Sequence, residues 1–292
     1  MTIEVSRPGP LTTIQDEGRP GLAHLGVPHS GAADLRGLHE ANGLAGNAGG
    51  AAALETTLVG PRLRFTQDAH VALAGAPTRP KLDGEPAPFG CALDVASGSV
   101  LDVGTASHGL RTYVAVRGGI DAPVVLGSRS TDTLTGLGPA PLRGGHVLAV
   151  GAGDGGAVET AATARGDDPD ADAVLRVTPG PRAGMFAAGA LDVLAASTYE
   201  VSADSSRVGV RFAGPALQRT DDRELLSEGL VRGALQVPAA GMPIAMLADH
   251  PTTGGYPVLA VVAQSDLPIL GQLRPGRRVR FALVQPNEGD SR

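Results

Sequence analysis

Short apolar and β-branched runs recur along the chain, separated by glycine and proline. Several of them alternate apolar and polar residues with a period of two, which is typical of strands with one buried face. Many short strands joined by Gly/Pro turns are typical of an all-β barrel or sandwich, so we predict a mainly β fold. The predicted strands lie in segments 70–76, 99–105, 112–119, 146–152, 174–180, 207–214, 256–263 and 277–284.

Helical periodicity is scarce and predicts only short helices. The best case is segment 33–46, where Leu35, Leu38, Ala41, Leu44 and Ala45 share one face and Gly46 can end the helix. A second helix is predicted in 185–197. A third short turn is predicted at 265–273, with Ser265 as its cap.

A small, polar and acidic segment without a period, residues 153–173, predicts a linker between two β-rich lobes. The lobes would be residues 1–152 and 174–286. Gly151, Gly153 and Gly156 follow a strand with the spacing of a dinucleotide-binding loop. That motif needs a long helix after the glycines, and the chain instead continues as "RGDDPDADA". We therefore interpret the glycines as part of a flexible joint.

Composition then excludes several functions. The formal net charge is −6 and there are eight aromatic residues, three Tyr and five Phe, which argues against nucleic-acid binding. One cysteine permits no internal disulfide and favours a reducing compartment. With neither a signal pattern nor an apolar span, we expect a soluble cytoplasmic protein that does not associate with membranes.

Lysine occurs once, as Lys81 in "RPKLDG". A Walker-type phosphate loop requires glycine before its lysine, and Pro80 stands there. Lys81 also lacks the context of a pyridoxal or biotin attachment site. We therefore expect no covalently bound cofactor in this chain.

Polar residues that could carry chemistry fall into three clusters. Each has a structural alternative: Asp34 could cap the first helix, Arg129 could form a surface ion pair, and the "DHPTTGGYP" turn could be a tight hairpin between core strands. The clusters are Gln15, Asp16, Arg19, His24, His29 and Asp34; Arg129, Ser130, Thr131 and Asp132; and Glu228, Gln236, Asp249, His250, Thr252, Thr253 and Tyr256.

These residue types suit a small polar amide. Carboxylates and amide oxygens accept N–H groups, while arginine, threonine hydroxyls and glycine-exposed backbone N–H groups hold a carbonyl oxygen. The histidines show no H-x-x-x-H pair and the serines no G-x-S-x-G elbow, so we expect neither a metal site nor a Ser-His-Asp triad.

Several long motifs occur in the order seen in one family. They are "TTIQDEGRPGLAHLGVPHSGAADL", "AALETTLVGPRLRF", "VRGGIDAPVVLGSRSTDT" and "SEGLVRGALQVPAAGMPIAMLADHPTTGGYPVLAVV". On these motifs the chain resembles the family of 5-oxoprolinase C subunits, also known as biotin-dependent carboxyltransferase or allophanate hydrolase subunit 2. The resemblance covers roughly residues 2–285. It departs at Ser206 and Val208, where Asp and Met are expected, and this bears on the substrate pocket.

The resemblance implies a cyclophilin-like β-barrel architecture and a hetero-oligomer with the smaller B subunit, of the allophanate hydrolase subunit 1 type. It also implies a third subunit and an ATP-dependent opening of 5-oxoproline to glutamate. The alternatives are a carboxyltransferase that uses biotin in trans on urea, as in urea amidolyase, and a non-catalytic regulator of a kinase-inhibitor-like partner.

The resemblance also implies roles for individual residues. Asp249 is the candidate general base, with Glu228 as a second catalytic residue. Arg129 is the candidate for binding an anionic group. The candidate substrate-binding residues are Gln15, Asp16, Arg19, Asp34, Arg129, Ser130, Asp132, Gln236, Thr252, Thr253, Gly254, Gly255 and Tyr256.

Overall fold

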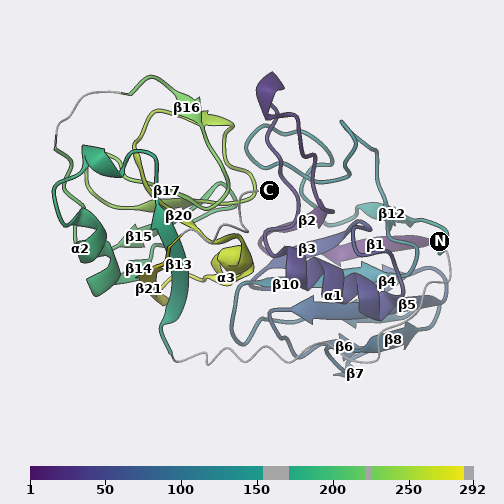
Figure 1. Ribbon diagram of the computed structural model, residues 1–292. Helices are drawn as coiled ribbons and strands as arrows, with labels where there is room; N and C mark the ends of the chain where they lie inside the picture. Colours follow the sequence, from purple (N-terminus) through teal and green to yellow (C-terminus); the bar gives the residue numbers. More distant parts are fainter. Residues whose placement is uncertain (154–170, 221–224, 286–292) are drawn as a thin grey trace. The chain divides into compact units, whose positions relative to one another are not determined.

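The computed structural model describes residues 1–153, 171–220 and 225–285 (Figure 1). The chain divides into two compact units. The first contains Met1–Pro20 and His29–Pro169, and the second contains Gly21–Pro28 and Asp170–Arg292. Most of the predicted linker 153–173 lies outside the described residues.

The first unit contains a seven-stranded and a five-stranded sheet, in which every neighbouring pair is antiparallel. The seven-stranded sheet has the order β11 (Ile120–Asp121), β12 (Val147–Val150), β1 (Thr2–Arg7), β4 (Arg62–Phe65), β9 (Val100–Asp102), β6 (Lys81–Leu82) and β7 (Glu85–Pro86). The five-stranded sheet has the order β2 (Thr12–Gln15), β3 (Ala53–Thr57), β10 (Arg111–Val116), β5 (Ala69–Gly75) and β8 (Ala92–Val95).

The central strands of the five-stranded sheet are buried on both faces, and β5 is apolar at almost every position. Side chains alternate between the faces of a strand. The larger ones on β5, Val71 and Leu73, enter a core shared with the seven-stranded sheet, whereas Ala72 and Ala74 face a second cluster that contains helix α1 (Leu35–Ala45). The first unit is therefore built in three layers, with α1 lying across β10 and β5 (Figure 1).

Helix α1 confirms the predicted first helix and its ends. The Asp34 carboxylate accepts a hydrogen bond from the Gly37 backbone N–H at 2.9 Å, so Asp34 is the N-cap. Gly46 ends the helix in the left-handed conformation at φ 74°. Gly37 has no room for a side chain, because an added Cβ would lie 2.8 Å from the Tyr113 ring. A glycine here lets the helix approach the sheet closely.

The second unit is a closed seven-stranded barrel, so the predicted mainly β, barrel-containing fold is confirmed. Its first and last strands pair in parallel, and the other neighbours are antiparallel. The barrel order is β13 (Ala173–Pro179), β20 (Val258–Val262), β17 (Ala234–Gln236), β18 (Ile244–Met246), β15 (Gly209–Ala213), β14 (Thr198–Val201) and β21 (Arg278–Leu283). A separate pair joins β16 (Glu228–Gly229) to β19 (Thr253–Gly254).

Three aromatic side chains pack in the barrel. Tyr199 and Phe212 each contact Phe281 edge to face, at ring-centroid distances of 5.6 and 5.3 Å. The Tyr199 hydroxyl donates to the Pro215 carbonyl at 3.1 Å. All three rings are almost fully buried, so they form a compact aromatic core for the second unit.

The other predicted helices are only partly right. Segment 185–197 forms helix α2 (Ala190–Ala196), which a left-handed Gly189 separates from the 3-10 turn η2 (Ala183–Met185). The turn η3 (Gln264–Asp266) leads into α3 (Leu267–Gln272), and η1 spans Ala23–Leu25. Among the described residues, no helix has the length and apolar character needed to cross a membrane.

The predicted cap of α3 is wrong. No side chain caps the helix, and the Ser265 hydroxyl instead accepts a hydrogen bond from Arg176 at 2.8 Å. Arg176 also forms an ion pair with Asp266. Burial raises the pKa of Asp266, but the hydrogen bonds from Arg176 outweigh it and hold that pKa below its usual value. A long-range partner has thus taken the polar groups that could have capped the helix.

All eight predicted strand segments contain a strand. The dinucleotide-binding interpretation is excluded by topology, because β12 pairs antiparallel with both β1 and β11. The fingerprint requires a strand of a parallel sheet at that place.

Candidate functional site

In the first unit, the Asp16 carboxylate joins two loops that are distant in sequence. Its Oδ1 accepts from the Gly18 N–H at 2.8 Å, from the Ser128 hydroxyl at 2.6 Å and from the Ser130 hydroxyl. Its Oδ2 accepts from the Arg129 N–H at 2.6 Å. We call the joined segments 15–19 and 125–132 the Asp16 loops. They bring Gln15, Asp16 and Arg19 of the first predicted cluster together with the second cluster, whereas His24 belongs to the second unit.

The strand that precedes Asp16 fixes this arrangement. β2 is buried along its whole length, and the Ile14 carbonyl accepts from the Thr131 N–H at 2.9 Å. The Gln15 side chain donates in turn to the Thr131 carbonyl at 2.9 Å and to the Thr13 hydroxyl at 3.0 Å. Hydrogen bonds in both directions therefore set the spacing of the Asp16 loops.

Arg19, at the end of the first of these loops, has an exposed fraction of 2%. Its Nη2 donates to the Ser130 carbonyl at 2.6 Å and its Nε to the Val125 carbonyl at 3.3 Å. Its Nη1 has no hydrogen-bond partner, and no described carboxylate forms an ion pair with this guanidinium. A buried cation without a counter-charge favours an anion or a carbonyl oxygen as its partner.

Three further buried polar atoms in the Asp16 loops have no partner among the described residues: Gln15 Oε1, Thr131 Oγ1 and Asp132 Oδ2. Buried polar atoms are ordinarily satisfied, so several unsatisfied ones in one connected cluster indicate a ligand site. Asp132 has a structural role as well, because its Oδ1 accepts from the Leu134 and Thr135 N–H groups.

Backbone conformation marks the same region. Among the described residues, four other than glycine have a positive φ, which such residues rarely adopt; Ser30 at 59° and Leu126 at 53° lie here, and Leu58 and Asp83 lie elsewhere. Ser30 bonds the Thr131 carbonyl at 3.0 Å, and Leu126 lies within the Asp16 loops. Strained backbone of this kind is concentrated at functional sites.

Arg129, the arginine predicted to bind an anionic group, lies at the surface. Its Nη2 contacts the Asp121 carboxylate at 3.1 Å, and both side chains are substantially exposed. Its contribution to the Asp16 loops comes from its backbone N–H alone. The surface ion pair that we considered as the alternative is therefore present.

A fully buried polar network surrounds Asp34 at the start of helix α1. The Glu55 carboxylate accepts from the Ala33 N–H and from the Tyr113 hydroxyl, both at 2.8 Å, and it forms an ion pair with Arg111. The Tyr113 hydroxyl accepts from the Asp34 N–H at 2.8 Å. Burial, and next the Glu55 charge, raises the pKa of Tyr113 well above its usual value. This network holds the start of α1, and the Asp34 carboxylate is used as its cap.

In the second unit, Asp249 is fully buried and paired with Arg207. The guanidinium Nε and Nη2 donate to Asp249 Oδ2 and Oδ1 at 2.9 and 3.0 Å, and the Asp249 N–H donates to the Arg207 carbonyl. A bidentate pair of this kind is strong and geometrically specific. Both carboxylate oxygens of the candidate general base are therefore already engaged.

Glu228 differs from Asp249 in having one oxygen unused. Its Oε2 accepts from Arg182 Nη2 and Nε at 2.7 and 3.0 Å. Its Oε1 is buried and has no partner among the described residues. The hydrogen bond and charge of Glu228 raise the pKa of Arg182, so this arginine stays charged.

The "DHPTTGGYP" turn is held at several points along its length. The Thr252 carbonyl accepts from the Leu230 N–H at 2.9 Å, β19 pairs with β16, and the Tyr256 carbonyl accepts from Gln236 at 3.0 Å. An added Cβ on Gly254 would lie 2.7 Å from Leu230 and 2.8 Å from Gln236, so this glycine permits close packing.

The rest of the turn remains accessible. The Tyr256 side chain is 51% exposed, Thr253 is exposed, and Thr252 and Gly255 are partly exposed. These groups could contact a ligand, whereas Gln236 is buried beneath them.

Sequence reasoning missed the residues that support the predicted ones: Ser30, Glu55, Arg111, Tyr113, Ser128, Arg182 and Arg207. The one available signal was a charge within an otherwise apolar run, as at Glu55 in "AALETT". Among the described residues, no group of three or more His, Cys, Asp or Glu side chains is placed to hold a metal ion.

Comparison with known proteins agrees with this architecture. The carboxyltransferase domain, subdomain A and B, matches residues 25–283. The chain is 38% identical over 290 residues to the C subunit of 5-oxoprolinase from Escherichia coli, covering 96% of this chain and 90% of that protein.

Two solved structures extend the comparison. TTHA0988 is 36% identical, with a TM-score of 0.85 over 96% of this chain and 56% of that one. The urea amidolyase of K. lactis is 29% identical, with a TM-score of 0.89 over 97% of this chain and 19% of that one. The chain thus spans about half of one solved protein and a fifth of the other.

A protein of two β-rich units that carries a carboxyltransferase-type fold is the class that these findings define. The chain belongs to the family of carboxyltransferase domains, subdomains A and B, which includes the 5-oxoprolinase C subunits. Its relatives are named as parts of enzymes, both 5-oxoprolinase and urea amidolyase.

Proposed function

We propose that this chain is a component of an ATP-dependent 5-oxoprolinase complex that opens 5-oxoproline to glutamate. It would act together with the smaller B subunit and a third subunit. One observation carries the proposal: the buried Arg19 guanidinium has an unused donor and no counter-ion among the described residues. A substrate with a carboxylate and an amide carbonyl supplies such a partner.

The neighbouring groups support an amide in particular. Arg19 Nη1 is a free donor and Gln15 Oε1 is a free acceptor, and an amide offers a carbonyl oxygen and an N–H as their complements. Both atoms are covered in the structure, so substrate would reach them when the Asp16 loops open. Arg19 therefore replaces Arg129 as the proposed anion-binding residue.

In the second unit, the proposal assigns different roles to the two catalytic candidates. Asp249 is a positioning residue, because Arg207 engages both of its oxygens and so fixes the start of the turn. Within this unit, Glu228, with Oε1 unused, is the carboxylate better suited to accept a proton. Thr252, Thr253, Gly255 and Tyr256 are the groups of the turn that a ligand could contact.

ATP is proposed to bind elsewhere in the complex. The chain has no G-x-x-x-x-G-K-[ST] loop, and its one lysine follows a proline. No step of the chemistry at Arg19 depends on ATP being held by this chain.

The test is glutamate release from 5-oxoproline with ATP by the reconstituted complex. We expect Arg19→Gln to lower kcat/KM about 10- to 100-fold, because a hydrogen bond to a charged group is lost. Arg129→Gln is the matched control, since it removes an arginine that contacts the same loops only through its backbone. It is expected to change kcat/KM less than about twofold, as for other surface ion pairs.

Thermal melting and co-purification with the B subunit would show that the Arg19 variant still folds and assembles. A folded, assembled Arg19→Gln complex with normal kcat/KM would remove this residue from the proposal. A loss of kcat/KM in the Arg129→Gln variant, with none in Arg19→Gln, would instead restore Arg129 as the proposed anion-binding residue.

The second candidate is a carboxyltransferase that uses biotin in trans, favoured by the match to the carboxyltransferase domain over residues 25–283. The free donor and acceptor at Arg19 and Gln15 also suit the ureido group of urea or biotin. Transfer of labelled bicarbonate carbon to urea, in the presence of a biotin carboxylase and a biotin-carrier protein, would support it. A stable complex with neither activity would favour the regulatory alternative.

A further inference from the structure

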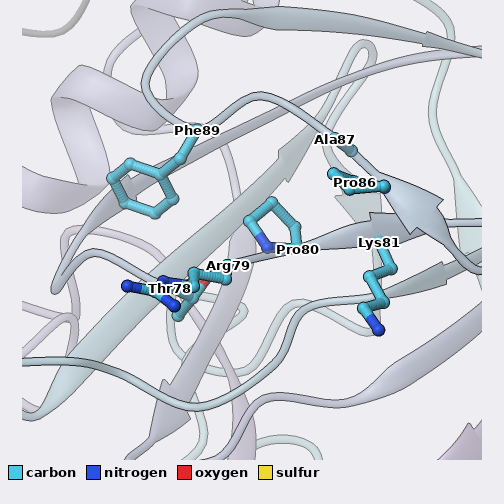
Figure 2. Close-up of a pocket in the computed structure, with 7 residues that line it drawn as sticks. All are labelled: Thr78, Arg79, Pro80, Lys81, Pro86, Ala87 and Phe89. Carbon is cyan, nitrogen blue, oxygen red and sulfur yellow. The ribbon is translucent and has the colours of Figure 1, made fainter.

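A pocket lies in the first unit, where the chain leaves β5 and enters the β6–β7 hairpin (Figure 2). It has a volume of about 400 Å³, within the range of small-molecule sites. None of its lining residues belongs to the Asp16 loops. They are Thr78, Arg79, Pro80, Lys81, Pro86, Ala87 and Phe89.

The pocket combines an apolar wall with two cations. The rings of Phe89, Pro80 and Pro86 provide flat apolar surface, and Arg79 and Lys81 extend on opposite sides of Pro80 (Figure 2). Such a lining suits a ligand with a compact apolar body.

Neither cation of this pocket forms an ion pair with a described carboxylate. The acid opposite Lys81 across the strands is Asp102, and its carboxylate is bonded to Arg7 at 3.0 and 3.1 Å. The hairpin has two acids. Asp83 accepts from the Val100 N–H at 2.8 Å, and Glu85 is exposed and pairs through its backbone with Leu82. Both cations of the pocket are thus without an ion-pair partner among the described residues.

Thr78 provides an independent indication of a ligand. Its exposed fraction is 8%, and its Oγ1 has no hydrogen-bond partner among the described residues. A buried hydroxyl without a partner is unfavourable, so an acceptor oxygen entering the pocket would gain a bond that the protein itself does not make.

We propose that this pocket binds a small organic monoanion, a carboxylate attached to a compact apolar body. The carboxylate would be held by Arg79, with the Thr78 hydroxyl as a further donor, and the apolar body would lie against Phe89 and the proline rings towards Lys81. The site is separate from the proposed oxoprolinase chemistry, and it can be tested without any turnover.

The chain itself supplies the probe, because Lys81 is its only lysine. Acylation of Lys81 by an N-hydroxysuccinimide ester can be followed by mass spectrometry, with a lysine-containing peptide in the same tube as reference. We expect benzoate to slow the labelling of Lys81 saturably and by at least about threefold, because the bound ring lies over the approach to the amine. Benzamide, which is neutral, and acetate, which has no apolar body, are expected to protect at least about threefold less.

Variants then test the assigned contacts. Arg79→Gln is expected to raise the benzoate concentration for half-protection at least about threefold, as for loss of an exposed charge pair. Arg36→Gln is the matched control, an exposed arginine of α1 in the same unit. Thr78→Val is expected to weaken protection while leaving the melting temperature unchanged or higher, because the unpartnered hydroxyl is removed.

Protection by benzamide equal to that by benzoate would overturn the proposal, as would labelling that benzoate does not slow. Identical half-protection in the Arg79→Gln and Arg36→Gln variants would overturn it as well. These outcomes are independent of glutamate release, so failure here and failure of the proposed function are distinguishable.

Discussion

Single residues whose chemistry looks catalytic in the sequence can be committed to structure in the fold. Asp249 stands in a polar turn with threonines and glycines, which suggested a general base. Its partner Arg207 is 42 positions earlier, and nothing local in the sequence links the two. Only the pairing of β15 with β18, next to these residues, brings them together. The sequence therefore shows a carboxylate at position 249, but it does not show that this carboxylate is bound by Arg207.

This pair gives a prediction about stability. Asp249→Ala removes the bidentate carboxylate partner of the buried Arg207 guanidinium and is expected to lower the free energy of unfolding by about 3–5 kcal/mol. Arg207→Met combined with Asp249→Leu is expected to recover most of that loss, because two apolar side chains of similar size need no charge partner. Urea unfolding followed by circular dichroism measures both.

An unchanged unfolding midpoint in Asp249→Ala would contradict the positioning role. Loss of glutamate release in this variant, taken alone, would not identify a base, because the turn itself is expected to loosen. Glu228→Gln is the sharper catalytic probe, since it keeps the shape of a side chain that already has one oxygen unused.

At the scale of elements, local sequence was sufficient wherever local physics decides the structure. The apolar runs of the eight predicted strands, and the cap and glycine stop of α1, depend on near neighbours. The predicted second helix was too long because Gly189 turns left-handed inside it, and the cap of α3 was lost to Arg176. Both errors thus occur where the structure is decided by the backbone conformation of a glycine or by a residue distant in the sequence, and not by near neighbours.

The first helix provides a prediction at this scale. Asp34→Ala removes the N-cap of α1 and is expected to lower the free energy of unfolding by about 0.5–2 kcal/mol. Asp34→Asn is expected to keep most of the stabilisation that the cap provides, because asparagine also caps helices. Arg36→Ala, an exposed change on the same helix, is the control and is expected to stay within about 0.5 kcal/mol. Equal melting temperatures for the Asp34→Ala variant and the unmodified protein would show that the cap contributes nothing.

At the scale of the whole molecule, the sequence indicated two β-rich lobes but not how each is closed. The Asp16 loops join positions more than a hundred residues apart, and so does the β13–β21 pair. Long-range pairing of this kind depends on topology, which the pattern of a single strand does not contain. The candidate ligand site was therefore predicted as two separate clusters, without the buried position of Arg19.

Tyr199, in the buried core of the second unit, makes the free energy of unfolding fall at alkaline pH. Burial raises the pKa of Tyr199 to about 12. This pKa lies above the value of about 10 that a tyrosine has in an unfolded chain. The contribution of the neutral Tyr199 hydroxyl to the free energy of unfolding is therefore fully present below pH 10 and is lost as pH rises through about 12. Tyr199→Phe keeps the ring contacts and loses one hydrogen bond, at a cost of about 1 kcal/mol at neutral pH.

We expect the difference in melting temperature between the unmodified protein and Tyr199→Phe to narrow between pH 8 and pH 11, because only the tyrosine chain has this group to ionise. Melting curves at both pH values provide the measurement. Parallel curves with a constant difference would contradict the assigned titration.

The parallel pairing of β13 with β21 has a consequence for biosynthesis. β13 begins at Ala173, and the strand that completes its sheet ends at Leu283. During translation the ribosome must therefore deliver about a hundred further residues before the first barrel strand acquires this neighbour. This edge of β13 therefore stays unpaired until synthesis has passed Leu283. Any partner protein that recognises the closed barrel consequently meets a chain that has been made at least as far as β21.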